Sequence, residues 1–256
     1  MDERSERETH DSPSTATGYG PAGHATPGGL SIAANGLRFV PSETRFEQGE
    51  RTDWTFRIVD DDGDTVTGFE EAHGEPAHLI LVRRDLTAFD HRHPTLEDDG
   101  TWRTAGLTFD DPGVYRAFVD VVVDGRPTTL GHDVFVPGEM TIEPSPETSH
   151  RTTAGGYAVE LLAGGIAAGE RTRLAFEIRD GDGRATRLEP YLGALGHLVA
   201  LREGDLAYLH VHPEGTDPES GRVAFGTRFP TPGRYRSFLQ AKPDGELITA
   251  RFDIVL

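Results

Sequence analysis

The sequence contains no cysteine. Without cysteine the chain has no disulfide bonds, no thiolate nucleophile, and no zinc or blue-copper site with cysteine ligands. Its only methionines, Met1 and Met140, are too few for a methionine-rich copper(I) site. Apolar runs of membrane-spanning length are missing, and no stretch has clear helical periodicity. Any transition-metal site in this chain must therefore be built from histidine and carboxylate side chains.

Positive charge is also scarce. The chain has 25 Lys and Arg residues against 43 Asp and Glu residues, a net charge of −18, and Lys242 is its only lysine. This balance disfavours nucleic acid and anionic membranes as partners and favours cations. The polar N-terminal segment, residues 1–29, lacks the hydrophobic core of a signal peptide, and its Gly, Pro, Ser and Thr content predicts a disordered tail.

The rest of the chain repeats itself at an offset of about 120 residues. GERTDWTFRIVDDDG at 49–63 matches GERTRLAFEIRDGDG at 169–183, and DPGVYRAF at 111–118 matches TPGRYRSF at 231–238. Matched blocks in the same order indicate a duplication, so both halves should share one fold. We predict one unit at 30–137, a linker at 138–150 and a second unit at 151–256.

Each unit reads as a series of short strands. Trp54, Phe56 and Ile58 alternate with polar residues and would share one face of a strand, and 31 glycines and 17 prolines indicate many turns. About seven strands per unit predict an all-β protein, with two tandem immunoglobulin-like (cupredoxin-like) β-sandwich domains after the tail. DPGVY and PGRY fit a tyrosine corner with Tyr115 and Tyr235, although these Pro-Gly pairs could equally mark ordinary turns.

Three histidines recur at identical spacing in the two units. They lie in HLILVRRDLTAFDHRHP at 78–94 and in HLVALREGDLAYLHVHP at 197–213. A hairpin with its turn at 85–86 or at 204–205 puts the first histidine of each segment opposite the last, with the middle one on the same face. The predicted metal ligands are His78, His91, His93, His197, His210 and His212.

Neutral imidazole suits divalent copper or zinc, so the expected cofactor is one of these metals. Water or a carboxylate would complete the coordination. The carboxylate candidates are Glu70, Glu75 and Glu189, and His73 is a further ligand candidate. The competing interpretation is that the six histidines are packed, hydrogen-bonded residues with no metal. The acidic turns at 60–64 and 180–182 lack EF-hand spacing and are expected to be solvated loops, and the other four histidines, His10, His24, His132 and His150, have no counterpart in the repeat.

Two stretches of the second unit, YLGALGHLVALREGDLAYLHVHP at 191–213 and PGRYRSFLQ at 232–240, resemble a family of bacterial, notably actinobacterial, β-sandwich proteins. That family is related to the YtkA-like proteins and is often described as heavy-metal-binding. The resemblance covers residues 30–256 and implies tandem sandwiches, a role in metal handling or resistance, and an exported or cell-envelope location. The chain departs from it in having no signal peptide.

The sequence is consistent with three functions. The first is a non-enzymatic copper- or zinc-binding protein, whose partners are the metal ion and another protein. The second is an immunoglobulin-like interaction or scaffold module without metal. The third, ranked last, is a hydrolase with histidine-bound metal and Glu70 or Glu189 as general base. The sequence has no His-Glu-x-x-His motif to support the third.

Overall fold

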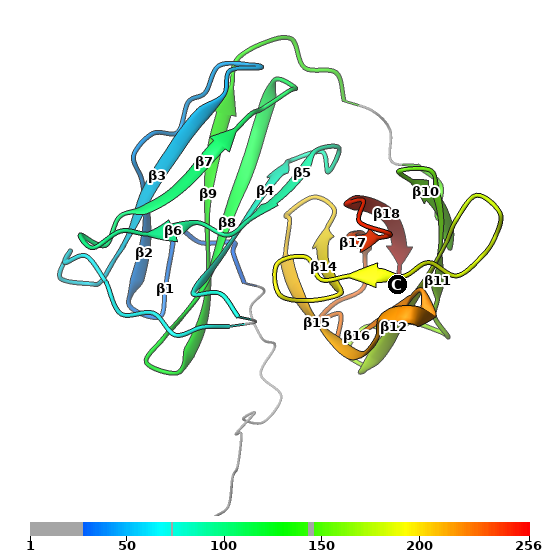
Figure 1. The fold of residues 1–256 in the computed structure, drawn as a ribbon. Helices are drawn as coiled ribbons and strands as arrows, with labels where there is room; N and C mark the ends of the chain where they lie inside the picture. The colour runs from blue at the N-terminus through cyan, green and yellow to red at the C-terminus, as the bar shows by residue number, and fades with distance from the viewer. Residues whose placement is uncertain (1–27, 73, 143–145) are drawn as a thin grey trace, which may run out of the picture.

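The computed structural model describes residues 28–72, 74–142 and 146–256, with the side chains of residues 210, 212, 215 and 216 left out. Two β-domains follow one another along the chain (Figure 1). Among the described residues, the only helical element is a single 3-10 turn, Pro218–Ser220, and no helix is long and apolar enough to cross a bilayer. The predicted all-β fold with two tandem sandwiches is confirmed. Residues 1–27 of the predicted tail lie outside the described residues.

Domain 1 is built from two antiparallel sheets. The first has the order β1-β2-β3-β7-β6 and the second the order β5-β4-β8-β9. The strands are β1 (Ala33–Ala34), β2 (Leu37–Pro41), β3 (Thr52–Val59), β4 (Ala77–Arg83), β5 (Phe89–Arg92), β6 (Thr95–Leu96), β7 (Trp102–Leu107), β8 (Gly113–Val123) and β9 (Arg126–Val136).

Domain 2 repeats this arrangement, with a short extra strand, β13, beside β17 and a difference at the strand that follows the hairpin. β15 pairs with β14 from Tyr208 to Val211 and with β16 from His212 to Asp217, with a bulge between Pro213 and Thr216, so it joins the two sheets. In domain 1 the same stretch is divided into β5 and β6. The strands are β10 (Arg151–Ala154), β11 (Tyr157–Leu162), β12 (Thr172–Arg179), β13 (Leu188–Glu189), β14 (Gly196–Arg202), β15 (Tyr208–Asp217), β16 (Arg222–Thr227), β17 (Arg234–Pro243) and β18 (Ile248–Val255).

The strand order identifies the sandwich type. Across the first sheet, strands A, B, E and D of an immunoglobulin sandwich correspond to β2, β3, β7 and β6. Across the second sheet, strands C, F and G correspond to β4, β8 and β9, and β5 is an additional strand at the edge. Each domain also has a tyrosine corner: the hydroxyl of Tyr115 donates to the carbonyl of Asp111 at 2.8 Å, and that of Tyr235 to the carbonyl of Thr231 at 3.0 Å. The structure thus supports the tyrosine-corner interpretation at both positions.

Replacing Tyr115 by Phe should lower the free energy of unfolding by about 1 kcal/mol, because one intramolecular hydrogen bond is lost without a change in packing. Burial raises the pKa of Tyr115 to about 12, so its hydroxyl remains a donor at neutral pH. Urea denaturation of Tyr115→Phe and of Tyr235→Phe measures the effect in each domain. No change in either variant would show that the corner bonds add nothing to stability.

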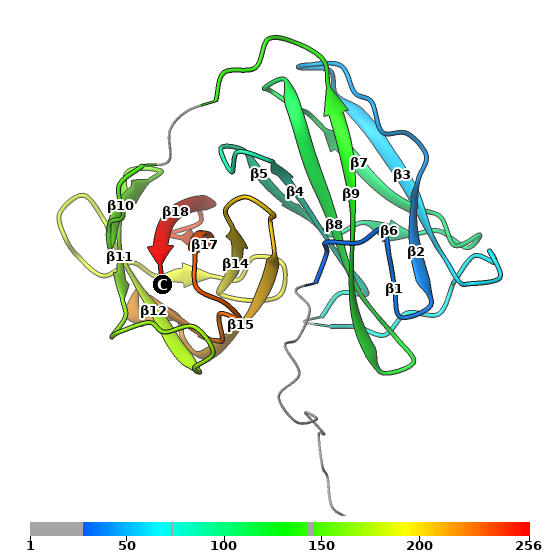
Figure 2. The same cartoon turned by 180° about the vertical axis from the view of Figure 1, so that it is seen from behind.

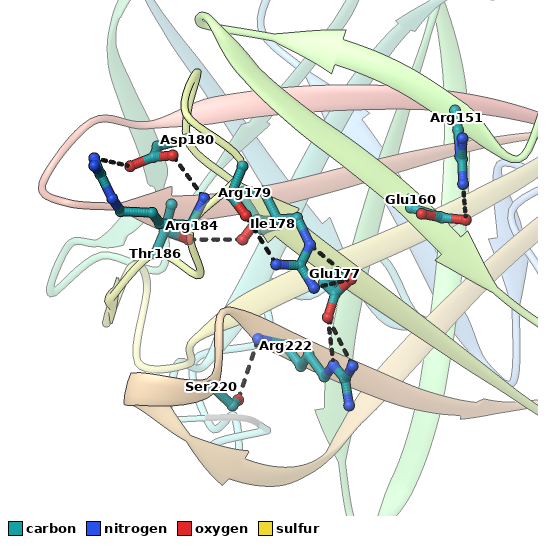
Figure 3. Close-up of polar contacts among 11 residues, drawn as sticks. Arg151, Glu160, Glu177, Ile178, Arg179, Asp180, Arg184, Thr186, Ser220 and Arg222 are labelled. Carbon is teal, nitrogen blue, oxygen red and sulfur yellow. Dashed lines mark hydrogen bonds and ion pairs between the residues drawn. The ribbon is translucent and has the colours of Figure 1, made fainter.

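Each domain has its own apolar core. Trp54, Phe56 and Trp102 are fully buried between the sheets of domain 1, and Phe176, Phe225 and Phe252 between those of domain 2. The outer sheet of domain 2 is polar where it faces solvent (Figure 3): Glu177 accepts hydrogen bonds from Arg222 and Arg179, and these bonds, with Arg222 contributing most, lower its pKa. Both cores are built from apolar side chains, so we expect each domain to fold without metal.

A third apolar cluster joins the two domains. The sheet with β4 and β8 faces the sheet with β14 and β17, as the views from both sides show (Figures 1 and 2). The contacts are reciprocal: Phe89 of domain 1 stacks on Phe238 of domain 2 at 4.3 Å between ring centroids, and Tyr208 of domain 2 stacks on Phe118 of domain 1 at 4.9 Å. Equivalent surfaces of the two copies therefore meet face to face. The buried members of this cluster are Ile80, Val82, Leu86, Phe118, Val199, Leu201, Leu206, Tyr208 and Phe238.

Polar contacts fix the alignment of the two sheets. The hydroxyl of Tyr208 donates to a carboxylate oxygen of Asp120 at 2.6 Å, and Arg236 donates to the carbonyl of Leu86 at 3.0 Å. Burial, with the negative charge of Asp120 adding to it, raises the pKa of Tyr208 well above its usual value, so the hydroxyl stays protonated. At the edge, Arg116 binds the carbonyl of Gly29 at 2.7 Å, which brings residue 29 against domain 1.

Candidate functional site

Both histidine segments form hairpins with the expected register. Ile80 pairs with His91 and Val82 with Phe89 in domain 1, and Val199 pairs with His210 in domain 2. Both turns differ from the two-residue turns expected at 85–86 and 204–205. A bond of 3.0 Å from the amide of Arg83 to the carbonyl of Ala88 and one of 3.1 Å from the amide of Arg202 to the carbonyl of Ala207 each close a four-residue loop. These loops have the expected centres, so the register is unchanged.

Strand alternation decides which way each hairpin side chain faces. Leu79 and Leu81 lie in the core of domain 1, whereas Ile80 and Val82 lie in the cluster between the domains. His78 and His91 belong to the second set by the period-two rule. The candidate ligands of domain 1 are therefore on the face that meets domain 2, and not on the outer surface.

Three histidines of domain 1 come together on that face. His78, His91 and His93 each offer a ring nitrogen, and these nitrogens lie within 4.8 Å of one another. His78 Nδ1 is 3.3 Å from His91 Nε2. His78 and His91 are each only 1% exposed. Spacing, burial and residue type thus match a histidine site for a transition metal.

An oxygen acceptor holds the second nitrogen of each of these rings. His78 Nε2 lies 2.9 Å from the carbonyl of Ala72, His91 Nδ1 lies 3.1 Å from Gln240 Oε1, and His93 Nδ1 lies 3.2 Å from Glu75 Oε1. The carbonyl of Ala72 can only accept, so His78 Nε2 carries the ring proton of His78. Histidine ligands of metals are oriented in this way by carbonyl and carboxylate groups outside the metal shell.

This tautomer leaves the lone pair of His78 on Nδ1, which lies 3.3 Å from His91 Nε2, and the two nitrogens form a hydrogen bond when His91 carries its proton on Nε2. Two ligand nitrogens of a tetrahedral zinc site are about 3.3 Å apart, given zinc–nitrogen bonds of about 2.0–2.1 Å. The geometry accordingly accommodates either a shared proton or a metal ion.

The second trio is described only in part. His197 is 4% exposed, and its Nε2 lies 2.8 Å from the carbonyl of Tyr191, in the same way that His78 binds Ala72. The His197 ring centroid is 5.0 Å from that of His91 and 6.4 Å from that of His93. The structure therefore brings His197 to the trio of domain 1. The side chains of His210 and His212 lie outside the described residues.

The carboxylates considered as further ligands each make another contact. Glu75 contacts the far side of the His93 ring as described above. Glu70 accepts a bond of 2.6 Å from the amide of Gly125, and Glu189 lies 3.5 Å from Lys242. His73 lies outside the described residues. The site as described thus has histidine nitrogens at its centre and Glu75 behind one of them.

The acidic turns form the solvated loops expected from the sequence. Asp60 Oδ1 accepts from the amides of Asp62 and Asp64, and Asp180 Oδ1 accepts from those of Asp182 and Arg184. These carboxylates stabilise their own turns. Sequence reasoning missed Gln240, which comes from domain 2 and binds His91 of domain 1 across 149 residues of chain.

Comparison with known proteins identifies the family of the repeat. Residues 33–138 and residues 152–256 each match a family described as a domain of unknown function, DUF8832. The chain belongs to this family. Its two DUF8832 domains are the two sandwiches described above, and each contains one histidine hairpin. The comparisons support the β-sandwich repeat of the resemblance noted from the sequence and give no support for its YtkA-like or heavy-metal-binding part.

Solved structures similar to the DUF8832 tandem include the FdeC adhesin of Escherichia coli, at 15% identity and a TM-score of 0.29, with 88% of this chain and 66% of that chain covered. InvD of Yersinia pseudotuberculosis is 14% identical, with a TM-score of 0.28, and the match covers 88% of this chain and 58% of that chain. The native α-2-macroglobulin of Escherichia coli is 13% identical, with a TM-score of 0.30, and the match covers 91% of this chain and 14% of that chain. The chain thus spans at most 66% of these structures. Likeness at this level carries no information on ligands. No curated protein sequence matches the chain.

Proposed function

We propose that the protein is a non-enzymatic, tandem immunoglobulin-like protein that binds a divalent transition metal, copper or zinc, through His78, His91 and His93. The observation that supports this most strongly is the closest nitrogen pair. His78 Nδ1 and His91 Nε2 are 3.3 Å apart, the separation of two nitrogens on one tetrahedral zinc ion, while the carbonyl of Ala72 holds the ring proton of His78 on the far side. A metal ion between these two nitrogens uses the His78 tautomer already in place.

The proposal is non-enzymatic because of how the site is enclosed. The trio lies between two packed sheets, and Glu70, one of the two glutamates considered as a general base, already accepts a hydrogen bond from a turn amide. A hydrolytic metal site needs an open coordination position that substrate can reach. The resemblance noted from the sequence places such proteins in the cell envelope, and we extend this location to the chain as part of the proposal.

The alternative is an immunoglobulin-like interaction or scaffold module without metal. One shared proton between His78 and His91 satisfies the same 3.3 Å geometry, and the histidines would then serve as a buried hydrogen-bond network between the domains. Adhesins are among the solved structures that the chain resembles, and this alternative would give the chain a comparable binding role.

Calorimetric titration of the untagged chain with Cu(II) and Zn(II) separates the two functions. We expect saturable binding that is lost on adding a chelator. The far-ultraviolet circular dichroism should stay unchanged on chelation, since each domain has its own apolar core. His150→Ala is the matched control because His150 is exposed and far from the hairpins in sequence. Wild-type protein that binds neither metal would leave the scaffold function standing.

A further inference from the structure

We propose that the two domains share one metal centre, in which His197 of domain 2 is a ligand together with His78, His91 and His93 of domain 1. The inference rests on the proposed function and gives it a consequence: the bound ion links the domains. It replaces two separate sites, one per hairpin, with a single site at the contact between them.

The ring positions fit one ion. Four imidazoles around a tetrahedral ion have ring centroids about 5.2 Å apart, given metal–nitrogen bonds of about 2.0–2.1 Å. Within the domain 1 trio the centroids are 4.5, 5.3 and 5.5 Å apart. The His197 centroid is 5.0 Å from His91 and 6.4 Å from His93. Of these five distances, the one between His197 and His93 departs most from the tetrahedral value, so ligation by His197 requires its ring to move about 1 Å toward the trio.

Ring orientation fits as well. The Nε2 atom of His197 is hydrogen bonded to the carbonyl of Tyr191, so its ring proton is on Nε2 and its lone pair is on Nδ1. This is the tautomer of His78, whose Nε2 is bonded to the carbonyl of Ala72. Both domains thus prepare the first histidine of their hairpin to ligate through Nδ1. Neutral imidazoles of this kind are ligands without any change of protonation.

Domain 2 contributes a second group to the same centre. Gln240 on β17 is 5% exposed and accepts from His91 Nδ1, while its amide nitrogen lies 3.4 Å from Thr249 Oγ1. Gln240 is therefore a positioning residue, which holds a domain 1 ligand in its tautomer from the other domain. Strand pairing places Gln240 beside His197 and, in the equivalent position of domain 1, Asp120 beside His78. The carboxylate of Glu75, 3.2 Å from His93 Nδ1, lies near enough to offset part of the charge of a divalent ion.

The experiment compares Cu(II) binding and Cu(II) electron paramagnetic resonance for full-length wild type, His197→Ala and His150→Ala. We expect His197→Ala to weaken Cu(II) binding by at least about 100-fold, because loss of a single outer-shell partner already costs about 10- to 100-fold. The nitrogen hyperfine pattern should change from four coupled nitrogens to three. His150→Ala should match wild type in both measurements. His197→Gln, which keeps the volume of the side chain, repeats the test if the alanine variant folds poorly.

The outcomes are distinct. Wild type that binds no Cu(II) overturns the proposed function and this inference together. Wild-type affinity and four nitrogens in His197→Ala overturn only the shared centre and leave a site in domain 1. Weaker binding with the nitrogen count unchanged shows that His197 is not a ligand and also overturns the inference.

Gln240 gives an independent check from domain 2. Gln240→Leu removes the acceptor of His91 Nδ1 at similar volume and should weaken Cu(II) binding by about 10- to 100-fold. Gln240→Glu keeps an acceptor oxygen and should restore binding. Equal affinities for wild type and Gln240→Leu would show that domain 2 does not orient the centre.

Discussion

Replacing Phe238 by Ala is expected to lower the free energy of unfolding by about 3–5 kcal/mol, the range for removal of a large buried aromatic side chain. Phe238 is fully buried, but it lies in the cluster between the domains and not in the core of domain 2. Its ring stacks on Phe89 at 4.3 Å and 9° between the ring planes. The loss should therefore fall on the contact between the domains, which should separate more readily.

Urea denaturation measures the loss of stability, and small-angle X-ray scattering measures whether the domains move apart. Phe135→Ala is the matched control, since Phe135 is 45% exposed on β9, and a surface change of this kind costs about 0.5 kcal/mol or less. If Phe238→Ala costs no more than Phe135→Ala, the contact between the domains contributes nothing to stability.

The hairpins were the most predictable part of the site. His78, His91 and His93 lie within 16 positions of one another in sequence, and a local turn with its centre at 85–86 fixes their register. Both turns contain four residues where two were expected, and the register is kept because the four-residue loops have the expected centres. Local chemistry thus determined which histidines share a face.

The sequences of the hairpins alone do not predict that the histidine face is buried against the other domain. Docking of the two domains depends on residues far apart in sequence, such as Phe89 with Phe238, and no local pattern encodes the pair. A signal was nonetheless present in LILV at 79–82 and in LVAL at 198–201. A strand that is apolar on both faces is typical of a sheet covered on both sides. All seven residues of β4 are buried, because the core covers one face and domain 2 the other.

The same docking explains why the sequence predicted two sites and why we propose one shared site. The repeat aligns His78 with His197, and an alignment treats the two copies as separate units. In the structure equivalent surfaces face each other, so equivalent histidines are brought toward a common centre, with His91 and His197 in ring contact at 5.0 Å. Duplication of a unit that buries one face against its own copy produces this result directly.

The double replacement His91→Ala and His93→Ala is expected to abolish metal binding, with a loss of more than about 100-fold in affinity, because it removes two of the proposed ligands at once. Circular dichroism should stay that of wild type, since neither side chain belongs to a core cluster. His150→Ala, at an exposed position, is the control. Unchanged binding in the first variant would place the metal outside the domain 1 trio.

Replacing His210 and His212 by Ala then distinguishes two arrangements of the second trio. Two separate sites lose half of the bound metal and keep the affinity of the rest, whereas one shared centre with His78, His91, His93 and His197 as its ligands keeps both its stoichiometry and its affinity. The shared centre has its four ligands without His210 and His212. We therefore expect the second result, an unchanged stoichiometry and affinity, measured by the same Cu(II) titration.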